Sequence, residues 1–303
     1  MNCLQPPTTA FRVFIHSIHI FSVPTYFITL LSLICVKSSV FKTYRLFLIW
    51  HVVENLLFEI YSSFLIVPAL HPPFTLIRTT GLLSEFGINP IIQFYILATA
   101  IEFNGLSMSE MFYFRYKAGL LNYREHRFSY YFRASVYLTR AISLMDICFC
   151  ILTFSDGSEF QQNYRATLVQ TNPLLPFLSC PNTYSVVPFA DYVSTIVLAS
   201  WICQTVNLTV SIPLAVGYMS ENVPKSISPA TWKIQQQLMW SLTIQAGIHG
   251  IMLGVPNAMF IYALFFGFIE EAPGYAAFVF LTYHGFLSAF SMIICTRQYG
   301  NIY

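Results

Sequence analysis

The sequence predicts an all-α membrane protein: one bundle of seven transmembrane helices, with the N-terminus outside the cell and the C-terminus in the cytosol. Only 9% of the 303 residues are charged and 56% are hydrophobic, whereas a soluble domain has about 25% charged residues. The apolar residues gather in long runs, each near the ~20 residues that a helix needs to cross a bilayer. The basic residues gather in alternate loops, as is typical of membrane proteins.

The stretch 87–116 is expected to be the central helix of this bundle. It has a long run without a basic side chain and ends in Phe114-Arg115-Tyr116-Lys117. It also contains Glu102 and Glu110. Ionisable groups are costly at membrane depth and usually face the interior of a helix bundle. We therefore expect this helix to be surrounded by others, with basic residues at one membrane face.

The other spans follow from the same pattern, and together they form a single domain over residues 1–303. The first span is too long for the apolar core of a signal peptide and is expected to remain in the membrane. The proline-rich segment after the second span and the polar segment 155–188 are expected to be surface loops. The seven spans are predicted at residues 11–36, 46–70, 87–116, 133–154, 192–218, 238–269 and 275–295.

The distribution of lysine and arginine sets the orientation. Loops on one side contain only Arg12, Arg78 and Arg165. By the positive-inside rule, the other, more basic set of loops is cytosolic. That set contains Lys37, Lys42, Arg45, Arg115, Lys117, Arg124, Arg127, Arg133, Lys225, Lys233 and Arg297.

Several ionisable residues fall inside the predicted spans. Glu110 and Arg140 lie at similar depths on neighbouring spans, so we predict that they pair or share a polar network; the alternative is that Arg140 turns toward the lipid headgroups. His284 among carboxylates could be protonated and serve as their counter-ion. These groups are either a ligand or ion site, or polar groups that hydrogen-bond to each other. The predicted intramembrane network comprises Glu54, Glu102, Glu110, Arg140 and His284.

Other classes of site find little support. The seven cysteines include no CxxC pair and no zinc-type spacing, so neither a metal nor a cofactor is expected. No phosphate-binding loop or nucleic-acid-binding basic tract is present. The scattered carboxylates do not form a catalytic set, so an enzyme is not expected. Cys180 lies in a predicted outer loop, and Cys3 is its candidate disulfide partner.

Motifs spread over most of the chain resemble nematode serpentine chemoreceptors, in the related class h and class i groups of the str superfamily. The resemblance implies a G-protein-coupled receptor for small molecules in the plasma membrane of chemosensory neurons and their cilia, with a role in olfaction. The motifs are Val67-Pro68, His71-Pro72-Pro73, Gly81-Leu82-Leu83, Phe86-Gly87-Ile88, Phe114-Arg115-Tyr116-Lys117-Ala118, Ile227-Ser228-Pro229-Ala230-Thr231, Gln235-Gln236-Gln237-Leu238 and Tyr283-His284-Gly285-Phe286-Leu287-Ser288.

A receptor mechanism assigns roles to a few of these residues. A small ligand would bias the packing of the third, sixth and seventh spans, with Pro256 as a kink in the sixth. Arg115 is then a switch for a heterotrimeric G protein, or alternatively an anchor at the membrane interface. A transporter or ion channel that uses the intramembrane carboxylates is the alternative function. The expected G-protein-coupling residues are Arg115, Tyr116, Lys117, Lys225 and Lys233.

Overall fold

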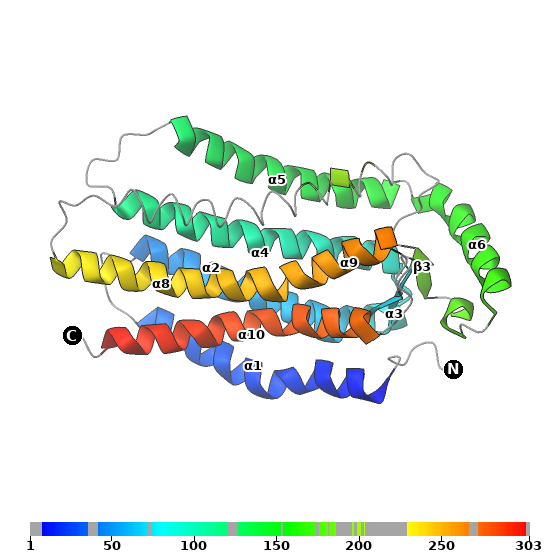
Figure 1. The fold of residues 1–303 in the computed structure, drawn as a ribbon, viewed down its shortest axis with the longest axis horizontal. Coiled ribbons are helices and arrows are strands. Elements are labelled where there is room, and N and C mark those ends of the chain that lie inside the picture. Colours follow the sequence, from blue (N-terminus) through cyan, green and yellow to red (C-terminus); the bar gives the residue numbers. More distant parts are fainter. Residues whose placement is uncertain are drawn as a thin grey trace.

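The fold is a bundle of long helices that lie side by side, capped at one end by a small sheet and a further helix (Figure 1). It is seen in a computed structural model. The structure describes residues 8–35, 42–71, 74, 76–119, 127–152, 154–173, 176–180, 182–185, 196, 199–200, 203, 229–266 and 272–300.

Six of the expected spans correspond to described helices. Most of the expected span at 192–218 lies outside the described residues. Within the described part, three helical stretches are long and apolar enough to cross a membrane: Thr9–Cys35, Pro90–Phe114 and Gly274–Ile294. The bundle helices are α1 (Thr9–Cys35), α2 (Lys42–Ile60), α4 (Pro90–Gly119), α5 (Arg127–Leu152), α8 (Pro229–Met252) with α9 (Gly254–Phe266), and α10 (Ala272–Gly300).

The outer surface of the bundle is apolar. Large side chains such as Phe21 on α1 and Leu138 on α5 are each 61% exposed. A soluble protein rarely exposes a continuous surface of this kind, so these faces are suited to contact with lipid. The polar side chains lie inside, where several helices meet.

The second span ends earlier than the sequence predicts. After α2 the chain makes one π-helical segment, η1 (Tyr61–Ile66), and then leaves the helix at Val67, whose φ is 41°. Pro68 follows, and a proline disfavours helical geometry in the residue before it. The expected helical residues 68–70 instead belong to strand β1 (Pro68–His71).

A three-stranded antiparallel sheet replaces the loops expected in this region. β1 pairs with β2 (Leu76–Thr79), with His71 opposite Leu76. β3 (Thr183–Ser185) adds to β2, with Leu76 opposite Ser185. Short strands with mixed polar and apolar residues carry little sequence signal, and this pairing joins segments far apart in the chain.

The segment 155–188, also expected to be a loop, contains helix α6 (Phe154–Thr171) and the 3-10 turn η2 (Pro176–Ser179). The Gln161 side chain on α6 donates to the Ser185 carbonyl at 2.9 Å and accepts from the Ser185 amide at 2.8 Å. Asn182 donates to the Thr79 carbonyl at 2.6 Å. We refer to β1–β3, α6, η2 and the short helix α3 (Leu82–Glu85) as the cap.

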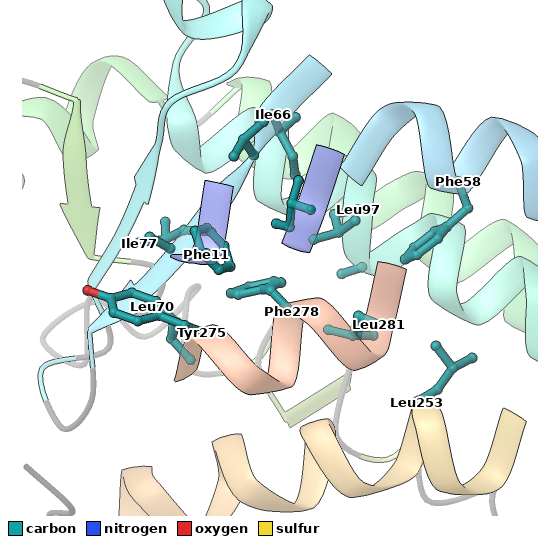
Figure 2. Close-up of a cluster of buried hydrophobic side chains, with 14 residues drawn as sticks. Phe11, Phe58, Ile66, Leu70, Ile77, Leu97, Leu253, Tyr275, Phe278 and Leu281 are labelled. Atoms are coloured by element: carbon teal, nitrogen blue, oxygen red, sulfur yellow. The ribbon is translucent and has the colours of Figure 1, made fainter. Parts of the chain in front are cut away.

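Apolar clusters fill the bundle at both ends. The cap-end cluster includes Phe58, Leu97, Leu253, Phe278 and Leu281, which come from α2, α4, the α8–α9 junction and α10 (Figure 2). The far-end cluster comprises Tyr44, Met108, Met111, Phe112 and Leu242.

Gly81 allows the cap to approach the bundle closely. Its amide donates to the Ile66 carbonyl at 3.0 Å, and an added Cβ would lie 2.6 Å from the Leu65 carbonyl carbon and 2.7 Å from that of Ile66. We expect Gly81→Ala to destabilise the protein by about 1–3 kcal/mol through overpacking. The measurement is the melting temperature of the purified protein in detergent. Gly250→Ala, where an added Cβ meets nothing within 4 Å, is the control and should show no such loss.

Candidate functional site: a polar layer inside the helix bundle

A layer of buried polar side chains lies between the two apolar clusters. Its members come from α2, α4, α8 and α10, and each is at most 5% exposed. Polar side chains at such a position are costly unless they have partners or a function. The polar layer comprises His51, Asn55, Asn104, Ser107, Gln245, His249, His284 and Ser288.

Three histidines form the centre of the polar layer. The ring of His249 lies 5.1 Å from that of His51 and 5.1 Å from that of His284, measured between centroids. His51 Nδ1 lies 2.7 Å from Ser107 Oγ. The Nδ1 atoms of His249 and His284 contact main-chain carbonyls of their own helices, at 3.0 Å and 2.5 Å. The Nε2 atoms of the three rings are buried and have no hydrogen-bond partner among the described residues.

Spacing along the helices produces this layer. His51 and Asn55 on α2, Gln245 and His249 on α8, and His284 and Ser288 on α10 are pairs separated by four residues. Residues four apart share one face of a helix, so each pair points to the same side. Sequence reasoning missed His51 and Asn55, which such a pair could have revealed, and Ser107, which belongs to none of these pairs.

A second polar network joins α1 to α2. Ser22 on α1 donates to the carboxylate of Glu59. His19 Nδ1 lies 3.3 Å from Glu59 Oε1, and its Nε2 lies 2.9 Å from Ser63 Oγ. Glu59 is 1% exposed. The network therefore holds a carboxylate inside the bundle through partners on both helices.

A third network joins α4 to α5. Arg140 Nη2 lies 2.9 Å from Glu110 Oε2, so these two residues form an ion pair. The Arg140 guanidinium lies 5.7 Å from the Phe103 ring centroid. On the same pair of helices, Ser143 donates to the Glu102 carboxylate. The carboxylate of Glu54 on α2 is buried without a hydrogen-bond partner among the described residues, and Arg140 and Glu110 are charged groups in its surroundings.

The structure separates His284 from the carboxylates with which the sequence grouped it. His284 contacts His249 and, edge-on at 4.8 Å, Phe58. No ion pair or hydrogen bond to a carboxylate is found for it within the described residues. The counter-ion role therefore stays a prediction without a described contact. α10 packs against α1, α2 and α8, whereas Glu102 and Glu110 lie on α4 and Arg140 on α5.

Pro256 lies just after the α8–α9 junction. α8 ends at Met252, four residues before the proline, and Leu253 interrupts the helix. A proline has no amide hydrogen for the carbonyl four residues earlier, and its ring clashes with that carbonyl. The Leu253 amide still donates to the His249 carbonyl at 2.9 Å, so the interruption begins directly after the turn that contains His249.

The remaining predicted residues lie mainly outside the described part. Cys180 is fully buried and disulfide-bonded; its partner is outside the described side chains, so the pairing with Cys3 stays a prediction. Arg115, Tyr116 and Lys117 belong to the last turns of α4 and Lys233 to the first turns of α8. The side chains of those four, and the whole of Cys3 and Lys225, are not among the described residues.

Among the described residues, no three histidine, cysteine, aspartate or glutamate side chains lie close enough to hold a metal ion. Four helices contribute side chains to the polar layer.

Comparisons with known proteins identify the family. Neither the curated proteins nor the solved structures include a match to this chain. The model of one protein family, serpentine type 7TM GPCR chemoreceptor Srh, matches residues 8–302. This match agrees with the helical bundle and apolar surface, and between the two groups suggested by the motifs it selects class h. The chain is a multi-pass membrane protein and belongs to the Srh family of serpentine seven-transmembrane chemoreceptors.

Proposed function

We propose that the protein binds a small molecule in the polar layer and signals to a heterotrimeric G protein at the plasma membrane of chemosensory neurons, in their cilia. The observation that carries this proposal is a set of buried polar atoms where α2, α4, α8 and α10 meet, which have no hydrogen-bond partner among the described residues. An unpartnered buried polar atom costs about 1–3 kcal/mol. A ligand that supplies the missing hydrogen bonds would recover this energy.

Such a ligand can change the packing of the helices. A ligand shifts a conformational equilibrium only by its difference in affinity for the two states. His51, Ser107, His249 and His284 lie on four different helices, so hydrogen bonds to them depend on how these helices are arranged. The interruption at Leu253, next to His249, gives the outer part of this helix a place to pivot.

The orientation follows from the basic residues. The end of the bundle opposite the cap contains Arg115, Lys117 and Lys233, together with the C-terminal end of α10. By the positive-inside rule we assign this end to the cytosol, where a G protein would bind. The cap then faces outward, and the N-terminus is extracellular.

Arg115→Ala tests the coupling role. We expect it to reduce ligand-evoked G-protein signalling by at least tenfold, because truncating a charged group at the centre of an interface typically costs 2 kcal/mol or more, roughly a thirtyfold change. The assay is a G-protein reporter in cells that express the protein, first screened with volatile and water-soluble cues on the unmodified chain.

The control is Arg12→Ala, because Arg12 lies on α1 at the cap end and should leave signalling unchanged. Both variants are compared at equal surface expression. Normal evoked signalling from Arg115→Ala would mean that the arginine is only an interface anchor.

The alternative of a transporter or channel receives less support from the described residues. Glu59, Glu102 and Glu110 are each held by a protein partner on a neighbouring helix. The polar layer is also flanked by the two apolar clusters instead of continuing to both membrane faces. Ligand-evoked current in cells without G proteins would nonetheless favour the alternative.

A further inference from the structure

The hydrogen bonds of the three histidines determine which ring nitrogen carries the proton. His249 Nδ1 contacts the Gln245 carbonyl and His284 Nδ1 contacts the Leu281 carbonyl. A carbonyl oxygen only accepts, so both Nδ1 atoms must donate. A neutral imidazole has one donor and one acceptor. The Nε2 atoms of His249 and His284 are therefore acceptors.

For His51, the position of the proton follows from its contact with Ser107. Ser107 donates its hydroxyl hydrogen to the Asn104 carbonyl at 3.0 Å. The Ser107 oxygen is then an acceptor for His51 Nδ1, 2.7 Å away. This makes His51 Nε2 an acceptor as well. No carboxylate forms an ion pair with any of the three rings within the described residues, so the rings are treated as neutral.

The polar layer consequently has an excess of unused acceptors. Besides the three Nε2 atoms, Gln245 Oε1, Asn104 Oδ1 and Asn55 Oδ1 are buried without a hydrogen-bond partner in the described part. The unused donors there are Asn55 Nδ2 and the Ser288 hydroxyl. A carboxylate ligand would add more acceptors, and an alcohol donates only one hydrogen bond. An ammonium group has three donors and no acceptor, so it matches this set best.

The charges nearby favour a cation. Glu54 and Glu110 both interact with the single guanidinium of Arg140. Two carboxylates and one guanidinium carry a formal charge of minus one. Glu54 lies one helical turn from His51 on α2, and both of its carboxylate oxygens are buried without a hydrogen-bond partner among the described residues. A cation beside the histidines would favour the ionised form of Glu54 and would then lie close to an excess negative charge.

Apolar side chains border the polar layer on its cap side. Phe58 contacts the His284 ring edge-on, and Leu253 and Leu281 belong to the same apolar cluster (Figure 2). A ligand that places an ammonium group among the histidines can therefore direct an apolar body toward Phe58. The preferred ligand has one polar end and one apolar end.

We propose that the polar layer binds a small organic amine as its ammonium ion, which donates hydrogen bonds to the Nε2 atoms of His51, His249 and His284. This inference rests on the proposed function, because it names the class of ligand for the same site. In this proposal the histidines accept the hydrogen bonds of the ammonium group, and the carboxylate of Glu54 attracts its positive charge. The apolar body of the amine would lie against Phe58.

The first test compares three probes of one size and shape with purified full-length protein in detergent. The probes are phenylethylamine, phenylethanol and phenylacetate, and the measurement is the dissociation constant by calorimetry, supported by the shift in melting temperature. We expect phenylethylamine to bind at least tenfold more tightly than phenylethanol, since hydrogen bonds to charged groups are worth about 1.5–3 kcal/mol. Phenylacetate should not bind.

The second test alters the acceptors one at a time. In His249→Asn, the side-chain amide can still donate to the Gln245 carbonyl, but the acceptor Nε2 is lost. This variant should therefore weaken amine binding by about tenfold. His249→Gln reaches as far as Nε2 and should restore part of the affinity. Glu54→Gln, which keeps the size of the side chain, should also weaken amine binding. His16→Asn changes an exposed histidine of α1 and serves as the matched control.

Three outcomes would overturn the proposal: equal or tighter binding of the alcohol or the acid, no binding of the amine, or amine binding that survives both His249→Asn and Glu54→Gln. Each can be told apart from failure of the proposed function, because binding is measured without a G protein. Amine binding without Arg115-dependent nucleotide exchange would refute only the coupling. Exchange driven by another ligand class would refute only this inference.

Discussion

Replacing Arg140 with methionine is expected to destabilise the protein by about 3–5 kcal/mol, the usual cost of removing one partner of a buried ion pair. Arg140 pairs with Glu110 at 2.9 Å, and the two side chains are only 26% and 22% exposed. What exposure they have is within a membrane helix pair, where no water is present to solvate the remaining carboxylate. Methionine keeps much of the length of the arginine side chain, so the loss reports the charge more than the packing.

The measurement is the melting temperature in detergent, together with surface expression in cells. The double variant Glu110→Gln with Arg140→Met should recover part of the loss, because it removes the charge of Glu110 together with that of its partner and leaves only Glu54 without the guanidinium. Lys37→Met, in a predicted cytosolic loop, removes a basic residue outside the spans and should have little effect. If the double variant is no more stable than Arg140→Met alone, the loss is not due to the unpaired carboxylate.

Replacing Gly285 with valine is expected to have a comparably large effect, through packing. Gly285 follows His284 on α10 at a close contact with α1 and α2. An added Cβ would collide with the Tyr26 hydroxyl and lie 3.0 Å from Asn55 Cβ and 3.3 Å from the Asn55 carbonyl oxygen. Overpacking costs about 1–3 kcal/mol for a small excess and more where the backbone must move. We expect Gly285→Ala to lower the melting temperature and Gly285→Val to abolish surface expression.

Two further variants separate this contact from a general effect of removing glycine. Gly247→Ala on α8 places a Cβ where nothing lies within 4 Å and should be neutral or slightly stabilising, because alanine favours helix by up to ~1 kcal/mol. Tyr26→Phe removes the hydroxyl that the new Cβ would meet and should recover part of the Gly285→Ala loss. No recovery would place the clash on Asn55, at its Cβ and carbonyl oxygen.

The strands and the helix of the cap could not be predicted from the sequence. β3 pairs with β2 across about a hundred residues of chain, and a run of three residues has no periodicity that would reveal this partner. Helix α6 lacks the apolar run of a membrane span, so hydropathy assigned its residues to a loop. Its position depends on Gln161 reaching Ser185, a contact that only the folded chain creates.

The sequence by itself determines that this chain is a membrane-embedded helix bundle. Scarce charges, long apolar runs and basic loops are properties of composition and of local segments, so they can be read without knowing which segments contact each other. It also places Glu110 and Arg140 at similar depths, since depth follows from the rise per residue. Only the tertiary structure decides which polar side chains meet. A helix that is apolar on nearly every side does not reveal which face turns inward, and close packing, such as that at Gly285, sets this rotation. For that reason His284 lies beside His249 and Phe58, and Glu102 and Glu110 form their contacts with α5.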